Sequence, residues 1–95
     1  MTKLVRLDCG NCTNFINSDL ITLTQLTNLN CKYNDNFTDE LLKHLTNLTY
    51  LECGKSRFTD DGVKYSINLT YLDYGSSNFT YYGLSYLSKL TELYY

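Results

Sequence analysis

The chain has 95 residues and a net charge of −2, with both signs scattered along its length. A chain of this size forms one domain at most, and its weak charge provides no electrostatic footprint for a nucleic acid or an anionic membrane. No apolar run approaches the roughly 20 residues that span a bilayer, and the first residues lack the apolar stretch of a signal peptide. We therefore expect a cytoplasmic protein with reduced thiols, and neither nucleic acid nor membrane as a partner.

One short pattern recurs along the whole sequence. It begins at leucines spaced by 22, 22, 21 and 21 residues: Leu4, Leu26, Leu48, Leu69 and Leu90. A phenylalanine stands 11 residues before each of the last four: Phe15, Phe37, Phe58 and Phe79. The pattern divides a single domain, 1–95, into units 4–25, 26–47, 48–68 and 69–89 and a partial unit 90–95. Such units bury their apolar faces by stacking on one another.

The first half of each unit predicts a β-strand. The leading leucine, the leucine three residues later and the residue two positions further are expected to point inward, as in Leu48, Leu51 and Cys53. A threonine follows the leading leucine in four of the units, and β-branched residues favour strands. Successive units should therefore align their inward residues in columns, from which one continuous core forms.

The second half of each unit predicts a short helix. A threonine that can accept a hydrogen bond from the first helical turn follows the phenylalanine at Thr38, Thr59 and Thr80. Ile16 takes this column in the first unit, so that Asn17 or Ser18 is expected to cap the first helix. Ser66 stands where the other units place an inward leucine, which predicts a shorter or rotated third helix.

The repeated pattern L-x-x-L-x-C/Y-x-x-C/N/S resembles the leucine-rich-repeat family, whose signature is L-x-x-L-x-L-x-x-N/C-x-L. The resemblance covers the whole chain. It implies an α/β fold: a right-handed leucine-rich-repeat solenoid, a horseshoe segment with a parallel concave sheet and short convex helices. It also implies a non-catalytic protein-interaction module that binds through the concave face.

The residues between the inward positions of each strand are expected to line this concave face. Tyr50 would lie beside Tyr71, and Glu52 beside Asp73, so that a tyrosine stripe runs next to an acidic stripe. Aromatic side chains dominate interface energies, and basic residues of a protein partner could stack on the rings and pair with the carboxylates. The predicted binding residues are Asn28, Asn30, Tyr50, Glu52, Tyr71, Asp73, Glu92 and Tyr94. The alternative is that the stripe is only a solvated sheet face.

A C-x-x-C motif runs from Cys9 to Cys12, and Cys31 would lie on the next strand. A structural zinc needs four ligands and a fourth is missing, so that we interpret these thiols as small core residues, with a metal or redox role or a Cys9–Cys31 disulfide as alternatives. His44 is the only histidine, and no motif places a nucleophile or a paired carboxylate with it. We therefore expect no enzyme activity, no cofactor and no metal.

Neither end of the sequence shows a recognisable capping segment, because the three residues before Leu4 are too few to cover a strand edge. Open solenoid ends and bare strand edges favour association. The alternative function is therefore a structural or assembly element that self-associates through its uncapped ends.

Overall fold

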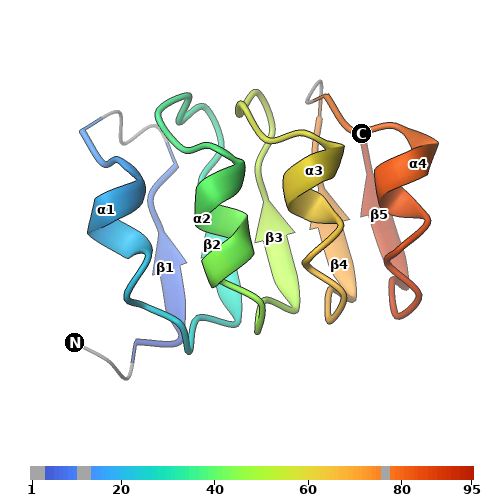
Figure 1. Cartoon of the computed structure of the whole chain (residues 1–95), viewed down its shortest axis with the longest axis horizontal. Coiled ribbons are helices and arrows are strands. Elements are labelled where there is room, and N and C mark those ends of the chain that lie inside the picture. Colours follow the sequence, from blue (N-terminus) through green and yellow to red (C-terminus); the bar gives the residue numbers. More distant parts are fainter. Residues whose placement is uncertain (1–3, 11–13, 76–77) are drawn as a thin grey trace.

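The computed structural model describes residues 4–10, 14–75 and 78–95. Strands and helices alternate along these residues in the order β1 (Arg6–Asp8), α1 (Asn17–Leu20), β2 (Asn28–Asn30), α2 (Asp39–His44), β3 (Tyr50–Glu52), α3 (Asp60–Val63), β4 (Tyr71–Asp73), α4 (Tyr81–Leu84) and β5 (Glu92–Tyr94). The strands form one parallel sheet in chain order, and the helices lie together on one side of it (Figure 1). The α/β solenoid predicted from the repeat is confirmed.

The register of the sheet places equal repeat positions side by side. The central leucine of each strand pairs with that of the next, from Leu7 through Leu29, Leu51 and Leu72 to Leu93. Two rows of side chains flank this column on the face away from the helices. We call them the first row (Arg6, Asn28, Tyr50, Tyr71, Glu92) and the second row (Asp8, Asn30, Glu52, Asp73, Tyr94).

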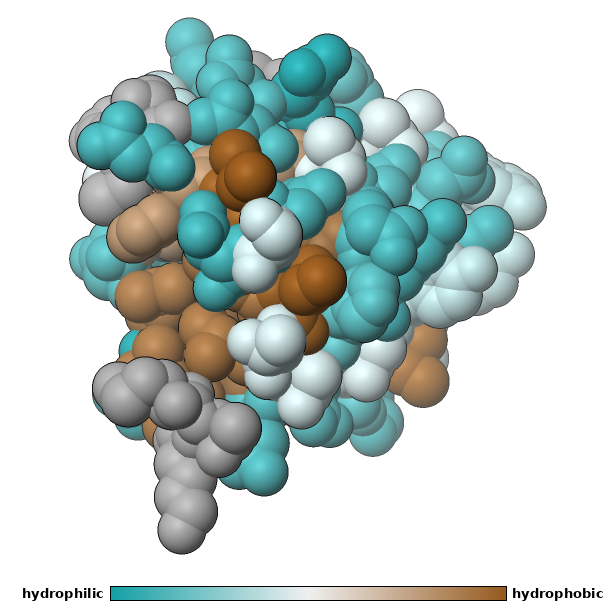
Figure 2. Space-filling model, turned by 60° about the vertical axis from the view of Figure 1, so that its left-hand side comes forward, coloured by the Kyte–Doolittle hydropathy of each residue, from teal (hydrophilic) through white to brown (hydrophobic). Residues whose placement is uncertain are grey.

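The core lies between the sheet and the helices and is densest in the middle units. The central leucines of β2, β3 and β4 are fully buried, as are Phe37 and Phe58. The end units are more open, because each end strand of the described sheet pairs with one neighbour: Phe15 is 38% exposed and Leu93 is 37% exposed. Figure 2 shows hydrophobic side chains gathered on the end that carries β1 and α1, where Val5 and Ile16 are exposed.

The threonine caps are confirmed at two of the three expected positions. The hydroxyl of Thr59 accepts a hydrogen bond from the Asp61 N–H at 3.3 Å, and α4 begins in the same way at Thr80. Thr38 precedes α2 but does not cap it with its side chain. Its hydroxyl instead accepts a hydrogen bond from the Asn17 amide at 2.7 Å.

The expected cap of the first helix is wrong. α1 begins at Asn17, directly after Ile16, so that neither Asn17 nor Ser18 is the capping residue. The carboxylate of Asp19 accepts a hydrogen bond from the Ile16 N–H at 2.8 Å and satisfies the helix terminus from within the unit. The amide of Asn17 is thereby left to contact Thr38 of the next unit.

A ladder of hydrogen bonds joins the starts of α2 and α3 to the next unit. The Asp39 carboxylate accepts hydrogen bonds from the Thr59 N–H at 2.7 Å and from the Thr59 hydroxyl at 2.5 Å. Gly62 leaves room for this carboxylate, since a Cβ there would lie 2.4 Å from Asp39 Oδ1. The same arrangement recurs one unit later with Asp60, Thr80 and Gly83. We call this series the Asp–Thr ladder.

Ser66 is fully buried, and its hydroxyl has no hydrogen-bond partner within the described residues. The helix before it, α3, has four residues and is shorter than α2, which has six. However, α1 and α4 also have four residues although their units carry leucine in this column. The serine therefore does not account for the length of α3.

Candidate functional site

Three tyrosines form a continuous aromatic stripe on the sheet face opposite the helices. Tyr50 and Tyr71 are register partners, and their rings stack with centroids 4.2 Å apart and planes 8° apart. Tyr94 extends the stripe from the second row, with its ring centroid 5.4 Å from that of Tyr71. Adjacent strands lie about 4.8 Å apart, so that equal positions on them place aromatic rings at stacking distance. The three rings therefore form one aromatic surface across β3, β4 and β5.

The acidic stripe predicted beside the tyrosines is uneven, because Glu52 is already engaged. Its carboxylate accepts a 2.6 Å hydrogen bond from the Tyr50 hydroxyl and lies 3.2 Å from Lys32 Nζ. The hydrogen bond to Glu52 is the main cause that raises the pKa of Tyr50 above its ordinary value, because it is lost when the phenol ionises. Glu52 thus orients Tyr50 and pairs internally with Lys32, and offers little charge to a partner.

In addition to Asp8 on β1, the available negative charge of this face comes from Asp73 and Glu92 over β4 and β5. Neither forms an ion pair within the part of the chain that the structure describes. Asp73 Oδ1 accepts a hydrogen bond from the Gly75 N–H at 3.3 Å, which orients the carboxylate. Glu92 is exposed, and its charge raises the pKa of Tyr94, whose hydroxyl lies 3.3 Å from the Glu92 carboxylate. A cation is therefore favoured over β4 and β5.

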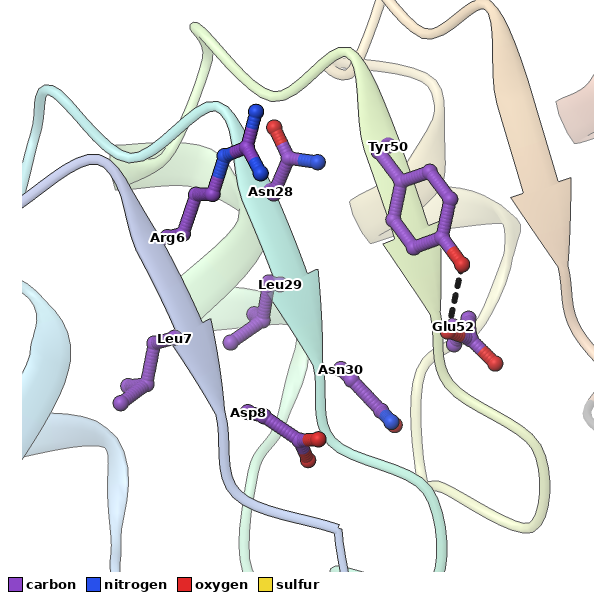
Figure 3. A pocket seen from close by; sticks show the side chains of 8 residues that line it. All are labelled: Arg6, Leu7, Asp8, Asn28, Leu29, Asn30, Tyr50 and Glu52. Carbon is purple, nitrogen blue, oxygen red and sulfur yellow. Dashed lines mark hydrogen bonds between the residues drawn. The ribbon is translucent and has the colours of Figure 1, made fainter.

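A shallow hollow of about 230 Å³ occupies the other half of this face, over β1, β2 and β3 (Figure 3). Arg6 and Asn28 lie at one end of it, and Asp8 and Asn30 lie at the other. Tyr50 and Glu52 form its wall towards β4. The structure thus places all eight predicted binding residues in the two rows of the same face: Asn28, Asn30, Tyr50, Glu52, Tyr71, Asp73, Glu92 and Tyr94.

Arg6 and Asp8, which line the hollow, are not among the predicted binding residues. The repeat does place them at outward strand positions of this face, and the register confirms that placement beside Asn28 and Asn30. Arg6 is exposed, and within the described residues it forms no ion pair. The face therefore also presents one free positive charge.

The cysteines of the described residues lie in the inward column, away from this face. Cys9, Cys31 and Cys53 are buried in the core, and burial is the main cause that raises the pKa of the Cys31 and Cys53 thiols. Cys12, the second cysteine of the C-x-x-C motif, lies outside the described residues. Among residues 4–10, 14–75 and 78–95, no group of three or more His, Cys, Asp or Glu side chains is placed to hold a metal ion.

Among solved structures, an internalin (inlF) from Listeria monocytogenes str. 4b F2365 is similar to this chain, with 31% sequence identity and a TM-score of 0.64. The match covers 78% of this chain and 22% of the internalin, so that the chain spans about a fifth of that protein. Comparisons with models of protein families and with curated proteins give no match. The repeated strand–helix units and the structural match identify the chain as a leucine-rich-repeat protein.

Leucine-rich-repeat folds typically bind proteins and are generally non-catalytic. None of the helices in the described residues is long and apolar enough to cross a membrane.

Proposed function

We propose that this chain is a non-catalytic, cytoplasmic protein-interaction module that binds its partner with the sheet face opposite the helices. The observation that carries the proposal is the ordered stripe of Tyr50, Tyr71 and Tyr94 beside the free carboxylates of Asp73 and Glu92. Tyrosines that are already stacked lose little conformational freedom on binding, so that more of their contact energy appears as affinity.

The chemistry of the stripe favours a partner with a basic residue over β4 and β5. An arginine side chain can lie flat on an aromatic ring and donate hydrogen bonds to a carboxylate at the same time. Tyr71 supplies such a ring, and Asp73 and Glu92 supply the carboxylates on the same and the next strand. Glu52 contributes indirectly, because its hydrogen bond holds the Tyr50 ring in the stack.

The proposal is tested by removing the rings from the sheet face. The variant Tyr50→Ser/Tyr71→Ser is compared with wild type and with the control variant Tyr82→Ser/Tyr86→Ser. The control removes a second tyrosine pair from the helix side, whose ring centroids are 5.9 Å apart. Proteins captured from a lysate of the native host are quantified by mass spectrometry, and a captured protein is then purified and titrated by calorimetry. We expect at least about a tenfold loss of affinity in the sheet-face variant and none in the helix-side variant.

Circular dichroism and thermal unfolding serve as the control for folding in both variants. If the sheet-face variant keeps its fold and binds the purified partner as tightly as wild type, the sheet face is not the binding surface.

A second candidate function, association of copies end to end, is favoured by the exposed apolar residues at the two ends of the sheet. Val5 and Ile16 are 45% and 51% exposed beside β1, and Leu93 and Tyr95 are 37% and 86% exposed at β5. In the described sheet, β1 and β5 each pair with one neighbour, so that each has a free edge of backbone groups. A head-to-tail contact would cover both edges in one interface.

Mass measurement across a dilution series separates this candidate from the first. Association through the ends predicts dimers and longer species at high concentration, and Leu93→Lys should shift the population towards the monomer. A monomer at every concentration would remove the candidate.

A further inference from the structure

We propose that the segment bound on this face is an extended peptide with an acidic side chain and a basic side chain six residues apart. The inference rests on the proposed function and adds the chemistry and the register of the partner. It is carried by the order of charges along the first row, which begins with Arg6 and ends with Glu92.

The positive end of the row lies at the hollow over β1 and β2. Arg6 is exposed and without an ion pair in the described residues, and the Asn28 amide lies beside it at the same end of the hollow (Figure 3). A guanidinium and an amide N–H donor together match a carboxylate. Asp8 lies at the opposite end of the hollow, so that a chain following the first row passes Arg6 rather than Asp8.

The negative end of the row lies at β5. Glu92 is exposed there and forms no ion pair within the described residues. Asp73 lies in the second row, as Asp8 does at β1, so that neither belongs to the path of the first row. Between the two charged ends the row presents the stacked rings of Tyr50 and Tyr71, which offer apolar contact and no net charge. The charge of Glu52, the remaining acid near the centre, is offset by Lys32. The first row is therefore positive, aromatic and negative in that order.

The geometry of the sheet sets the spacing of the complementary charges. Four strand-to-strand steps of about 4.8 Å separate Arg6 from Glu92, which is about 19 Å along the row. An extended chain rises about 3.3 Å per residue, so that about six residues cover this distance. Side chains six positions apart in an extended peptide point to the same side, because their orientation alternates with a period of two. A peptide of seven residues thus reaches both charges with its first and last side chains.

The same charges argue against other occupants. A nucleic acid needs several cations along its path, and the first row offers only Arg6 within the described residues. A uniformly basic segment would bring its charge against Arg6, and a uniformly acidic one would bring its charge against Glu92. A segment with one charge of each sign avoids both penalties.

The test uses a random seven-residue peptide display library, selected on wild type, Arg6→Glu and Tyr50→Ser/Tyr71→Ser. Wild type should enrich peptides with an acidic and a basic residue at the first and seventh positions, in either order. Arg6→Glu should enrich peptides with basic residues at both positions, at the same spacing. Two synthetic peptides, one acidic–basic and one basic–basic, are then titrated against both proteins. Wild type should bind the acidic–basic peptide more tightly and Arg6→Glu the basic–basic one, with the ratio of the two affinities changing at least about tenfold.

The outcomes distinguish the inference from the proposed function. One outcome is that enrichment depends on Tyr50 and Tyr71 but Arg6→Glu selects peptides with the same charges as wild type does. This outcome would overturn the inference and still support the proposed binding face. A wild type that enriches no peptide overturns the extended-peptide inference, whereas the capture experiment still decides the proposed function. Equal enrichment by wild type and Tyr50→Ser/Tyr71→Ser would contradict both the proposed binding face and the inference.

Discussion

The middle of the solenoid and its last strand follow the same sequence pattern but reach different degrees of burial. Leu51 in β3 and Leu93 in β5 hold the same inward position, yet Leu51 is fully buried and Leu93 is 37% exposed. β3 has a neighbouring strand on each side, whereas β5 has one in the described sheet. Burial in this fold is therefore conferred by stacking between units, and the pattern within one unit is not sufficient.

The largest expected effect tests this difference directly with Leu51→Ala and Leu93→Ala. Leu51→Ala should lower the free energy of unfolding by about 3 kcal/mol, because it removes a buried side chain and leaves a cavity. Leu93→Ala should cost about 1 kcal/mol or less, since much of that side chain already contacts solvent. Urea denaturation of both variants measures the two values, and equal losses would contradict the role assigned to stacking.

The inward thiols of the middle units predict a pH dependence. Burial raises the pKa of Cys31 and Cys53 in the folded state, so that above about pH 8.5 these thiols ionise in the unfolded chain but stay neutral in the folded one. The free energy of unfolding is therefore unaffected by these thiols below that pH. It falls as the pH rises above it, by about 1.4 kcal/mol per pH unit for each thiol.

Urea denaturation between pH 7.5 and 9.5 measures this slope. Cys31→Ala should reduce this slope by the contribution of one thiol. This holds whatever stability the variant loses at pH 7.5. A free energy of unfolding that does not change over this range would show that the thiols are accessible to water in the folded protein.

The Asp–Thr ladder predicts that alanine destabilises the protein at Gly62 but not at Gly75. Gly62→Ala should destabilise the protein by about 1–2 kcal/mol, because its Cβ would lie 2.4 Å from Asp39 Oδ1 and displace the carboxylate from Thr59. The intrinsic helix preference of alanine offsets part of that loss. Gly75→Ala is the control, since its Cβ would lie 3.6 Å from Asp73 Oδ1 at ordinary contact distance. Thermal unfolding compares them, and an unchanged midpoint for Gly62→Ala would contradict the ladder.

The smallest expected effect is a gain in stability at Ser66. Its buried hydroxyl has no partner within the described residues, so that Ser66→Ala should raise the free energy of unfolding by about 0.5–1 kcal/mol. Ser88→Ala, at an exposed position, should stay within about 0.5 kcal/mol of wild type. Urea denaturation measures both, and a loss of stability in Ser66→Ala would show that the hydroxyl is hydrogen-bonded in solution.

Much of the fold and part of the candidate site could be predicted, because equal positions of successive repeat units lie side by side in the sheet. Once the leucines at 21- and 22-residue spacing are aligned, Tyr50 must lie opposite Tyr71 and Glu52 opposite Asp73, as the structure shows. The pairing of Glu52 with Lys32 could not be predicted in this way. Lys32 belongs to the loop after β2, and the path of that loop decides whether its side chain reaches the next strand.

The sequence by itself determined which residues face the core, which share a row on the sheet and that the units stack, because these follow from periodicity alone. The tertiary structure decided how much of each charge remains free and how each helix begins. Asp39 and Asp60, the first residues of their helices, bind the next unit. At the start of α1, where Asn17 or Ser18 was expected as the cap, the Asp19 carboxylate binds the Ile16 N–H. The contacts of Asp39 and Asp60 depend on distances between side chains in different units, which no pattern within one unit specifies.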